Sequence, residues 1–113
     1  MEERMYTVIK ATSYIIIALG IVHVALAFPI QANEDSLWFL GSGFAVIFAG
    51  FLNYIAINNK VTMISHMIAA LVNIICCGLF IFALSVLGDA MQYIGIIIFG
   101  ITAIAFMALL IKK

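Results

Sequence analysis

Residues 61–87 read VTMISHMIAALVNIICCGLFIFALSVL, a run without a single Asp, Glu, Lys or Arg. A transmembrane helix needs about 20 predominantly apolar residues to cross the hydrocarbon core of a bilayer. Three more runs of this kind occupy residues 11–28, 36–57 and 91–111, and only short hydrophilic joints separate the four. The sequence therefore predicts four membrane-spanning helices.

The composition indicates one membrane domain. Of the 113 residues, 67% are hydrophobic and 9% are charged. A soluble domain of this length could not bury so much apolar surface, because the interior of a small domain is limited. We therefore expect residues 1–113 to form a single all-α integral membrane bundle.

The charges of the joints alternate in sign. All of the Lys and Arg residues lie before the first run, between the second and third, or after the fourth: Arg4, Lys10, Lys60, Lys112 and Lys113. The two remaining joints carry only Glu34, Asp35 and Asp89. Basic residues near helix ends stay in the cytoplasm. This pattern predicts an up-down-up-down topology with both termini cytoplasmic.

Small and polar residues recur at seven-residue intervals within the runs. Helices in lipid associate through small residues and interhelical hydrogen bonds, and a seven-residue period keeps one face toward neighbours in a left-handed bundle. The predicted seam comprises Ser13, Gly20 and Ala27; Ser36, Gly43 and Gly50; His66, Asn73 and Phe80; and Gly95 and Thr102. We expect the seam inside and Ile, Leu, Val and Phe toward lipid.

Counting ~1.5 Å per residue from the cytoplasmic helix ends predicts two layers of polar side chains. The inner layer contains Ser13, Asn53 and His66; the outer layer contains His23, Asn73 and Thr102, with Ser42 nearby. Polar groups inside a membrane usually face the bundle interior or a wet cavity. The outer layer is the predicted ligand site. The alternative for both layers is interhelical hydrogen bonding, worth ~0.6 kcal/mol per bond on average.

Two histidines on membrane helices raise the question of haem. By the same count His23 and His66 differ by roughly 10 Å along the bundle axis, which is too far for the two axial ligands of one haem. A haem held by one histidine remains an alternative, and no other cofactor or metal is predicted. The adjacent Cys76 and Cys77 point ~100° apart on a helix and are predicted to pack as small hydrophobic residues.

The first run has a second interpretation, as a cleaved signal peptide, because Ala25-Leu26-Ala27 has the small-x-small pattern of a cleavage site. The acidic Glu2-Glu3 start and His23 inside the run are atypical of such peptides. We therefore expect this run to be the first spanning helix.

Three classes of function remain. No acidic residue lies within a run and no zinc-ligand cluster is visible, so an enzyme is not predicted. The net charge of zero gives no basic patch for nucleic acid. The first class is a non-catalytic binding or accessory module that contacts membrane lipids and assembles with copies of itself or a partner membrane subunit. The alternatives are a small-solute transporter or facilitator, and a haem or redox protein.

Overall fold

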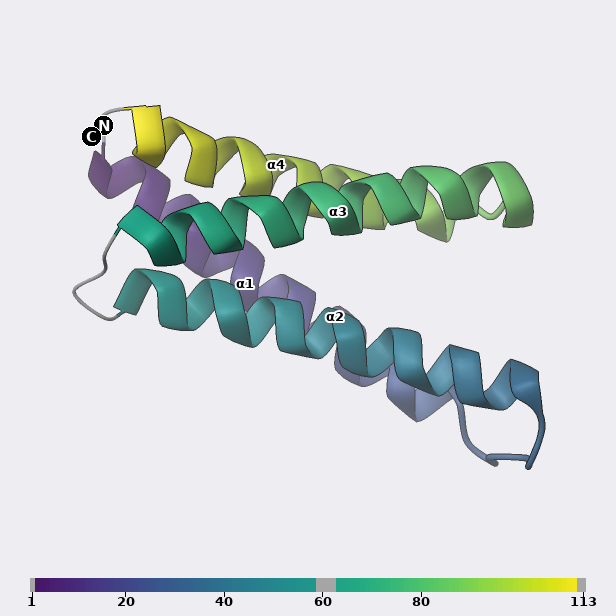
Figure 1. The fold of residues 1–113 in the computed structure, drawn as a ribbon. Coiled ribbons are helices and arrows are strands. Elements are labelled where there is room, and N and C mark those ends of the chain that lie inside the picture. The colour runs from purple at the N-terminus through teal and green to yellow at the C-terminus, as the bar shows by residue number, and fades with distance from the viewer. Residues whose placement is uncertain (1, 59–62, 112–113) are drawn as a thin grey trace.

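The computed structural model describes residues 2–58 and 63–111, and this part of the chain is helical apart from two short joints (Figure 1). Its helices are α1 (Glu2–Leu26), α2 (Glu34–Asn58), α3 (Met63–Leu87) and α4 (Met91–Ile111). Each helix is long and apolar enough to cross a membrane. The all-helical fold with four candidate membrane spans is thus confirmed.

Helix α1 begins well before residue 11, where the uncharged run begins. Glu2 and Glu3 occupy its first turn, where carboxylates interact favourably with the helix macrodipole. Ile9 is fully buried in a cluster with Phe106 and Leu109 of α4. The uncharged run therefore marks the part suited to hydrocarbon, whereas the helix extends into charged sequence because capping and packing stabilise it there.

Local signals define the two described joints. Helix α1 ends before Pro29, and a proline disfavours helical conformation in the residue before it. Asn33 caps α2, because its side-chain Oδ1 accepts a hydrogen bond from the backbone N–H of Ser36 at 2.8 Å. After α3, Gly88 has a φ of 68°, the left-handed conformation that glycine adopts without steric cost.

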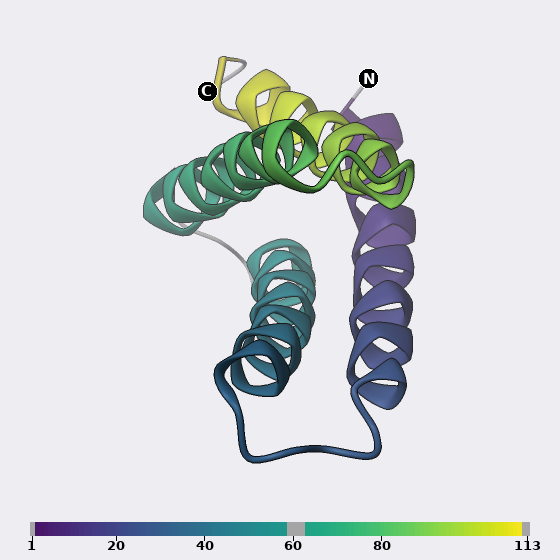
Figure 2. The same ribbon diagram turned by 90° about the vertical axis from the view of Figure 1, so that its right-hand side faces the viewer.

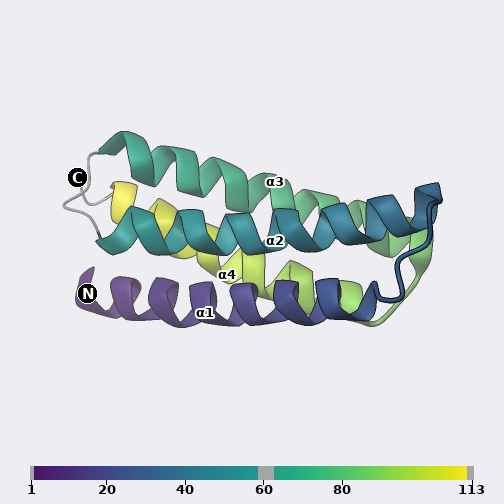
Figure 3. The same cartoon turned by 90° about the horizontal axis from the view of Figure 1, so that it is seen from below.

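The helices form two close pairs, α1 with α2 and α3 with α4, and α4 also contacts α1 (Figures 1 and 3). Helix α1 begins, α2 ends, α3 begins and α4 ends at one end of the molecule, which we call the closed end. At the other end, the open end, the α1–α2 joint and the α3–α4 joint lie far apart (Figure 2). Helices α2 and α3 therefore approach each other toward the closed end and diverge toward the open end.

Glycines allow α1 and α2 to pack closely. A Cβ on Gly20 would lie 3.0 Å from the backbone N of Ile47 and 3.1 Å from the carbonyl O of Gly43. A Cβ on Gly50 would lie 3.2 Å from the backbone N of Ile17. These distances are shorter than ordinary van der Waals contacts to backbone atoms, so this helix separation depends on glycine.

Most of the predicted seam lies inside the bundle. Its buried members are Ser13, Gly20, Gly43, Gly50, His66, Asn73, Gly95 and Thr102. Ala27 follows the end of α1, and Ser36 is half-buried in the first turn of α2. Long apolar side chains such as Leu71 and Ile104 are exposed on the outside, as expected.

Two clusters of buried apolar side chains make up the core. The cluster nearer the closed end contains Ile9, Ala56, Ala69, Ala70, Ala105, Phe106 and Leu109. The second contains Ile16, Ala49, Ile98 and Phe99. The many alanines permit close helix contacts, and the large Phe side chains fill the remaining space.

Candidate functional site

Asn53 and Asn73 are hydrogen-bonded to each other across α2 and α3. The Nδ2 of Asn53 donates to the Oδ1 of Asn73 at 3.0 Å, and the Nδ2 of Asn73 donates to the Oδ1 of Asn53 at 2.7 Å. Both residues are fully buried. The grouping of Asn53 with an inner layer and Asn73 with an outer layer is therefore wrong.

The error has a geometric cause. Residue counting gives the heights of Cα atoms, but the Cα–Cβ bond of a helical residue tilts toward the N-terminus of its helix. Helix α2 ends at the closed end and α3 begins there (Figure 1). The side chain of Asn53 therefore leans toward the open end and that of Asn73 toward the closed end, which reduces the difference in height that residue counting gave.

Two other predicted polar residues are bonded within their own helices. The hydroxyl of Ser13 donates to the carbonyl O of Ile9 at 2.6 Å, and that of Thr102 donates to the carbonyl O of Ile98 at 2.7 Å. Such bonds to the preceding turn satisfy a buried hydroxyl without a partner helix. Thr102 is thus buried in α4 and does not join the hydrogen bonds of His23.

The two histidines lie toward opposite ends of the molecule. His66 is buried in the first turn of α3, at the closed end, with its ring centroid 6.3 Å from that of Tyr6 and 5.8 Å from that of Phe106. His23 lies in the last turn of α1, at the open end. The structure therefore does not bring the two histidines together. Within residues 2–58 and 63–111, no group of three or more His, Cys, Asp or Glu side chains could hold a metal ion.

His23 and Ser42, both assigned from the sequence to the ligand site, do meet. The Nε2 of His23 lies 3.0 Å from the Oγ of Ser42 and 3.0 Å from the carbonyl O of Phe39. The Ser42 hydroxyl also donates to this carbonyl at 2.8 Å. The imidazole stacks on the Phe39 ring, with centroids 3.9 Å apart and planes inclined by 16°. These contacts join α1 to α2 near the open end.

This geometry assigns the proton of the neutral His23 ring. A carbonyl oxygen only accepts hydrogen bonds, so the 3.0 Å contact with Phe39 is a hydrogen bond when Nε2 donates, and Nδ1 then carries the lone pair. A Cβ on Gly43 would lie 3.0 Å from the Cδ2 of His23, so the Cδ2–Nε2 edge faces α2. The opposite edge, with Nδ1, points away from α2. Among the described residues, the hydrogen bonds of His23 all involve Nε2.

His23 continues a series of buried residues along α1. Ile9, Ile16 and His23 are seven residues apart, so they lie on the same side of the helix. Ile9 and Ile16 are fully buried in the two clusters that include α4 side chains. His23 is half-buried and lies in the last turn of α1, at the end where the helix pairs diverge (Figure 2). It therefore lies on the side of α1 that faces the α3/α4 pair.

Helix α2 carries a matching series. Ala56 and Ala49 are buried in the two core clusters, and the same seven-residue step continues to Ser42 and then Asp35. Ser42 and Asp35 are exposed. In the sequence Asp35 belongs to a hydrophilic joint, and it was not among the predicted site residues. The seven-residue spacing from Ser42 was the signal that could have found it.

We call His23, Ser42, Phe39 and Asp35 the open-end cluster. A surface hollow of about 240 Å³ adjoins it, lined by Leu26, Ala27, Asp35, Ser36 and Phe39. The cluster thus combines a ring nitrogen with a lone pair, a hydroxyl, a carboxylate and apolar surface, at the level where the two helix pairs separate.

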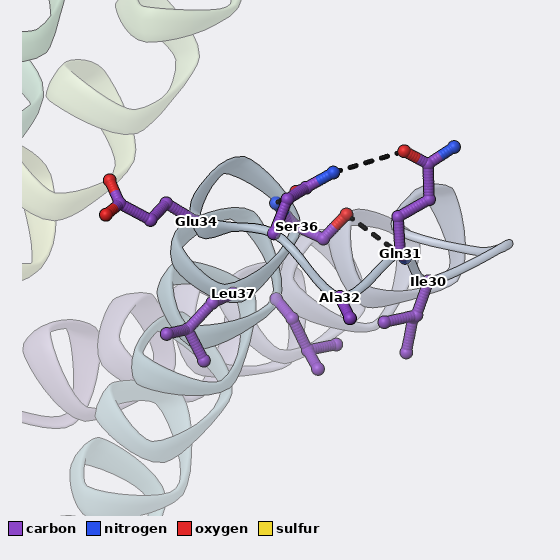
Figure 4. A pocket seen from close by; sticks show the side chains of 8 residues that line it. Ile30, Gln31, Ala32, Glu34, Ser36 and Leu37 are labelled. Carbon is purple, nitrogen blue, oxygen red and sulfur yellow. Dashed lines mark hydrogen bonds between the residues drawn. The ribbon is translucent and has the colours of Figure 1, made fainter.

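A larger hollow, of about 480 Å³, lies within the α1–α2 joint and the start of α2 (Figure 4). Its polar groups are engaged in the joint itself: Ser36 Oγ accepts from the backbone N–H of Gln31 at 3.3 Å, and Asn33 Nδ2 donates to Gln31 Oε1 at 3.1 Å. The Glu34 carboxylate points away from these bonds. This hollow results from the helix cap and brings together none of the sequence-predicted site residues.

No protein-family model, curated protein or solved structure matches the chain.

Proposed function

We propose that this protein is a non-catalytic membrane module that binds a small ligand from the membrane phase at its open-end cluster. One observation carries the proposal. Toward the closed end, the seven-residue series consist of the apolar Ile9 and Ile16 on α1 and Ala56 and Ala49 on α2. Where the helix pairs diverge, both series continue with polar residues: His23 on α1, and Ser42 and Asp35 on α2.

The cost of polar groups in a membrane supports this assignment. A histidine or hydroxyl near hydrocarbon loses hydration, so such groups tend to occur where they bind something or line a wet site. An apolar residue at position 23 would extend the Ile9 and Ile16 series without that cost. A ligand that completes the hydrogen bonding of His23 would explain why this position is polar.

Binding is better supported than passage of a solute through the bundle. A facilitator needs a polar route that continues toward the closed end. Toward that end, Asn53 and Asn73 are bonded to each other, and Ser13 is bonded to its own helix. The hydrogen bonds of these side chains support the helix bundle rather than a route for a solute. A haem held by His23 or His66 remains the further alternative.

We infer that the open end faces away from the cytoplasm and that both termini are cytoplasmic, in an up-down-up-down, left-handed bundle. The charge distribution supports this orientation. Arg4 and Lys10 belong to the closed-end part of α1, and Glu34, Asp35 and Asp89 to the open end. The exposed apolar side chains of the helices would contact lipids and further copies or a partner membrane subunit.

Native mass spectrometry in a lipid-retaining detergent tests the proposed function. We expect an added mass on the full-length protein that His23→Ala removes and Thr7→Ala retains, because Thr7 is an exposed residue near the closed end. Circular dichroism should show both variants folded. Bare protein throughout, or an added mass that His23→Ala leaves unchanged, would contradict a ligand site at the open-end cluster.

A further inference from the structure

The open-end cluster specifies the chemistry of its ligand, given the proposed binding function on which this inference rests. His23 Nε2 is committed to the Phe39 carbonyl and Ser42, so the ring offers its Nδ1 lone pair on the edge that points away from α2. A lone pair accepts a hydrogen bond. The ligand group beside His23 must therefore present an N–H or O–H donor.

The charge of the open end narrows the class of ligand further. Asp35 lies on the same side of α2 as Ser42 and lines the hollow next to Phe39. Residues 27–33 and 88–90, which form the joints of the open end, contain no Lys or Arg. A carboxylate or phosphate head would face uncompensated negative charge there, whereas a cation would be attracted.

The surroundings of the open-end cluster also favour a ligand with an apolar body. Val72 of α3 and Ile98 of α4 belong to the packing of the second core cluster. One to two helix turns closer to the open end, on the same sides of these helices, lie the exposed side chains of Leu79 and Ile94. Both lie toward the end of the molecule at which the helix pairs diverge (Figure 2). A hydrocarbon chain that enters from the lipid would cover such surface.

We propose that the open-end cluster binds an amphiphile with a primary ammonium head, a membrane-dissolved alkylamine in its protonated form. The Asp35 carboxylate pairs with the ammonium, and one N–H of the head donates to Nδ1 of His23. Charge-assisted hydrogen bonds of this kind are stronger than neutral ones. The alkyl chain lies between the helix pairs. A quaternary ammonium carries the charge but has no N–H, and an alcohol has the donor without the charge.

These differences define the test. The full-length protein, with ¹⁵N-labelled histidine, is placed in phosphatidylcholine nanodiscs at pH 7.5 and titrated with dodecylamine, dodecyltrimethylammonium, dodecanol or dodecanoate. The ¹⁵N resonance of His23 Nδ1 reports a donated hydrogen bond. His66, buried near the closed end, serves as an internal reference. We expect a saturable shift of His23 alone, with dodecylamine binding about tenfold more tightly than the quaternary amine or the alcohol.

Variants separate the two contacts. Asp35→Asn should weaken the binding of dodecylamine about tenfold and leave the affinity for dodecanol unchanged, because only the ion pair is lost. Glu34→Gln is the matched control: it removes the same charge from the neighbouring residue, whose carboxylate points away from the hydrogen bonds of the joint (Figure 4). His23→Ala should weaken the binding of both dodecylamine and dodecanol. Binding to this variant is followed through the amide resonances around Phe39. Backbone spectra confirm that each variant is folded.

The outcomes are distinguishable. Equal or tighter binding of dodecyltrimethylammonium or dodecanoate, or equal losses in Asp35→Asn and Glu34→Gln, would overturn the ammonium assignment while leaving a binding module. Failure of all four amphiphiles to give a saturable response at His23 would overturn the assignment together with the proposed membrane-phase ligand.

Discussion

Asn53 on α2 and Asn73 on α3 exchange two amide hydrogen bonds, of 3.0 and 2.7 Å, in a fully buried environment. Asn73 donates in addition to the carbonyl O of Ala69 in its own helix at 2.6 Å. This pair ties together the two helix pairs toward the closed end, and beyond it α2 and α3 diverge (Figure 1).

The pair should be strongly coupled in stability. Asn53→Leu or Asn73→Leu leaves one buried amide without its partner, which costs about 1–3 kcal/mol. The double variant removes both amides and should cost less than the sum of the two single changes. Steric trapping in bicelles measures the free energies of unfolding. Additive losses would contradict the direct pairing of the two side chains.

The close approach of α1 and α2 should depend on Gly20. In Gly20→Ala the new Cβ meets the backbone of Ile47 and Gly43, so the helices must separate, at a cost of about 1–3 kcal/mol. Gly41→Ala is the control, because a Cβ there has nothing within 4 Å, and alanine favours a helix by up to ~1 kcal/mol. The same unfolding assay compares them. Equal effects would show that α1 and α2 do not pack at Gly20.

The His23 ring should be protonated on Nε2 in the neutral, ligand-free protein. Nitrogen NMR of labelled histidine distinguishes the two tautomers. Ser42→Ala should leave the tautomer unchanged, because the Phe39 carbonyl still accepts from Nε2 at 3.0 Å. A proton on Nδ1 in the wild-type protein would contradict the arrangement of His23 against α2 and remove the basis for a donor-bearing ligand.

The proposed orientation predicts which engineered cysteines can be labelled in intact cells. In a Cys76→Ala, Cys77→Ala background, Gln31→Cys lies in the exposed α1–α2 joint and should react with a membrane-impermeant maleimide from outside. Thr7→Cys, exposed near the closed end, should react only after the cells are opened. The reverse pattern would place the termini outside the cytoplasm.

The sequence predicted the helices and much of the bundle interior. An uncharged run of about 20 residues is typical of a membrane helix, and small residues such as Gly43 and Gly50 are typical of the places where such helices touch. The start of α1 was not predicted. That start depends on Ile9 packing against α4, a contact between distant parts of the chain that local sequence cannot reveal.

The candidate site was predicted in part. His23 and Ser42 were grouped from the sequence and do meet, but Asn73 and Thr102 were grouped with them. Residue counting treated the helices as parallel rods with side chains at the height of their Cα atoms. Side-chain lean helps Asn73 to reach Asn53, and the bond from Thr102 to Ile98 satisfies the hydroxyl without a partner helix. Asp35 was not among the predicted site residues, because it lies in a hydrophilic joint outside the uncharged runs.

The divergence of the two helix pairs also makes the protein a wedge. The two helix pairs lie farther apart at the open end than at the closed end (Figure 1), so in a bilayer the protein would span more width in one leaflet than in the other. A wedge-shaped protein fits best in a membrane that is curved so that the leaflet around the wide end of the protein is on the convex side. In a membrane, the divergence at the end of α1 that carries His23 would therefore favour a curved bilayer over a flat one.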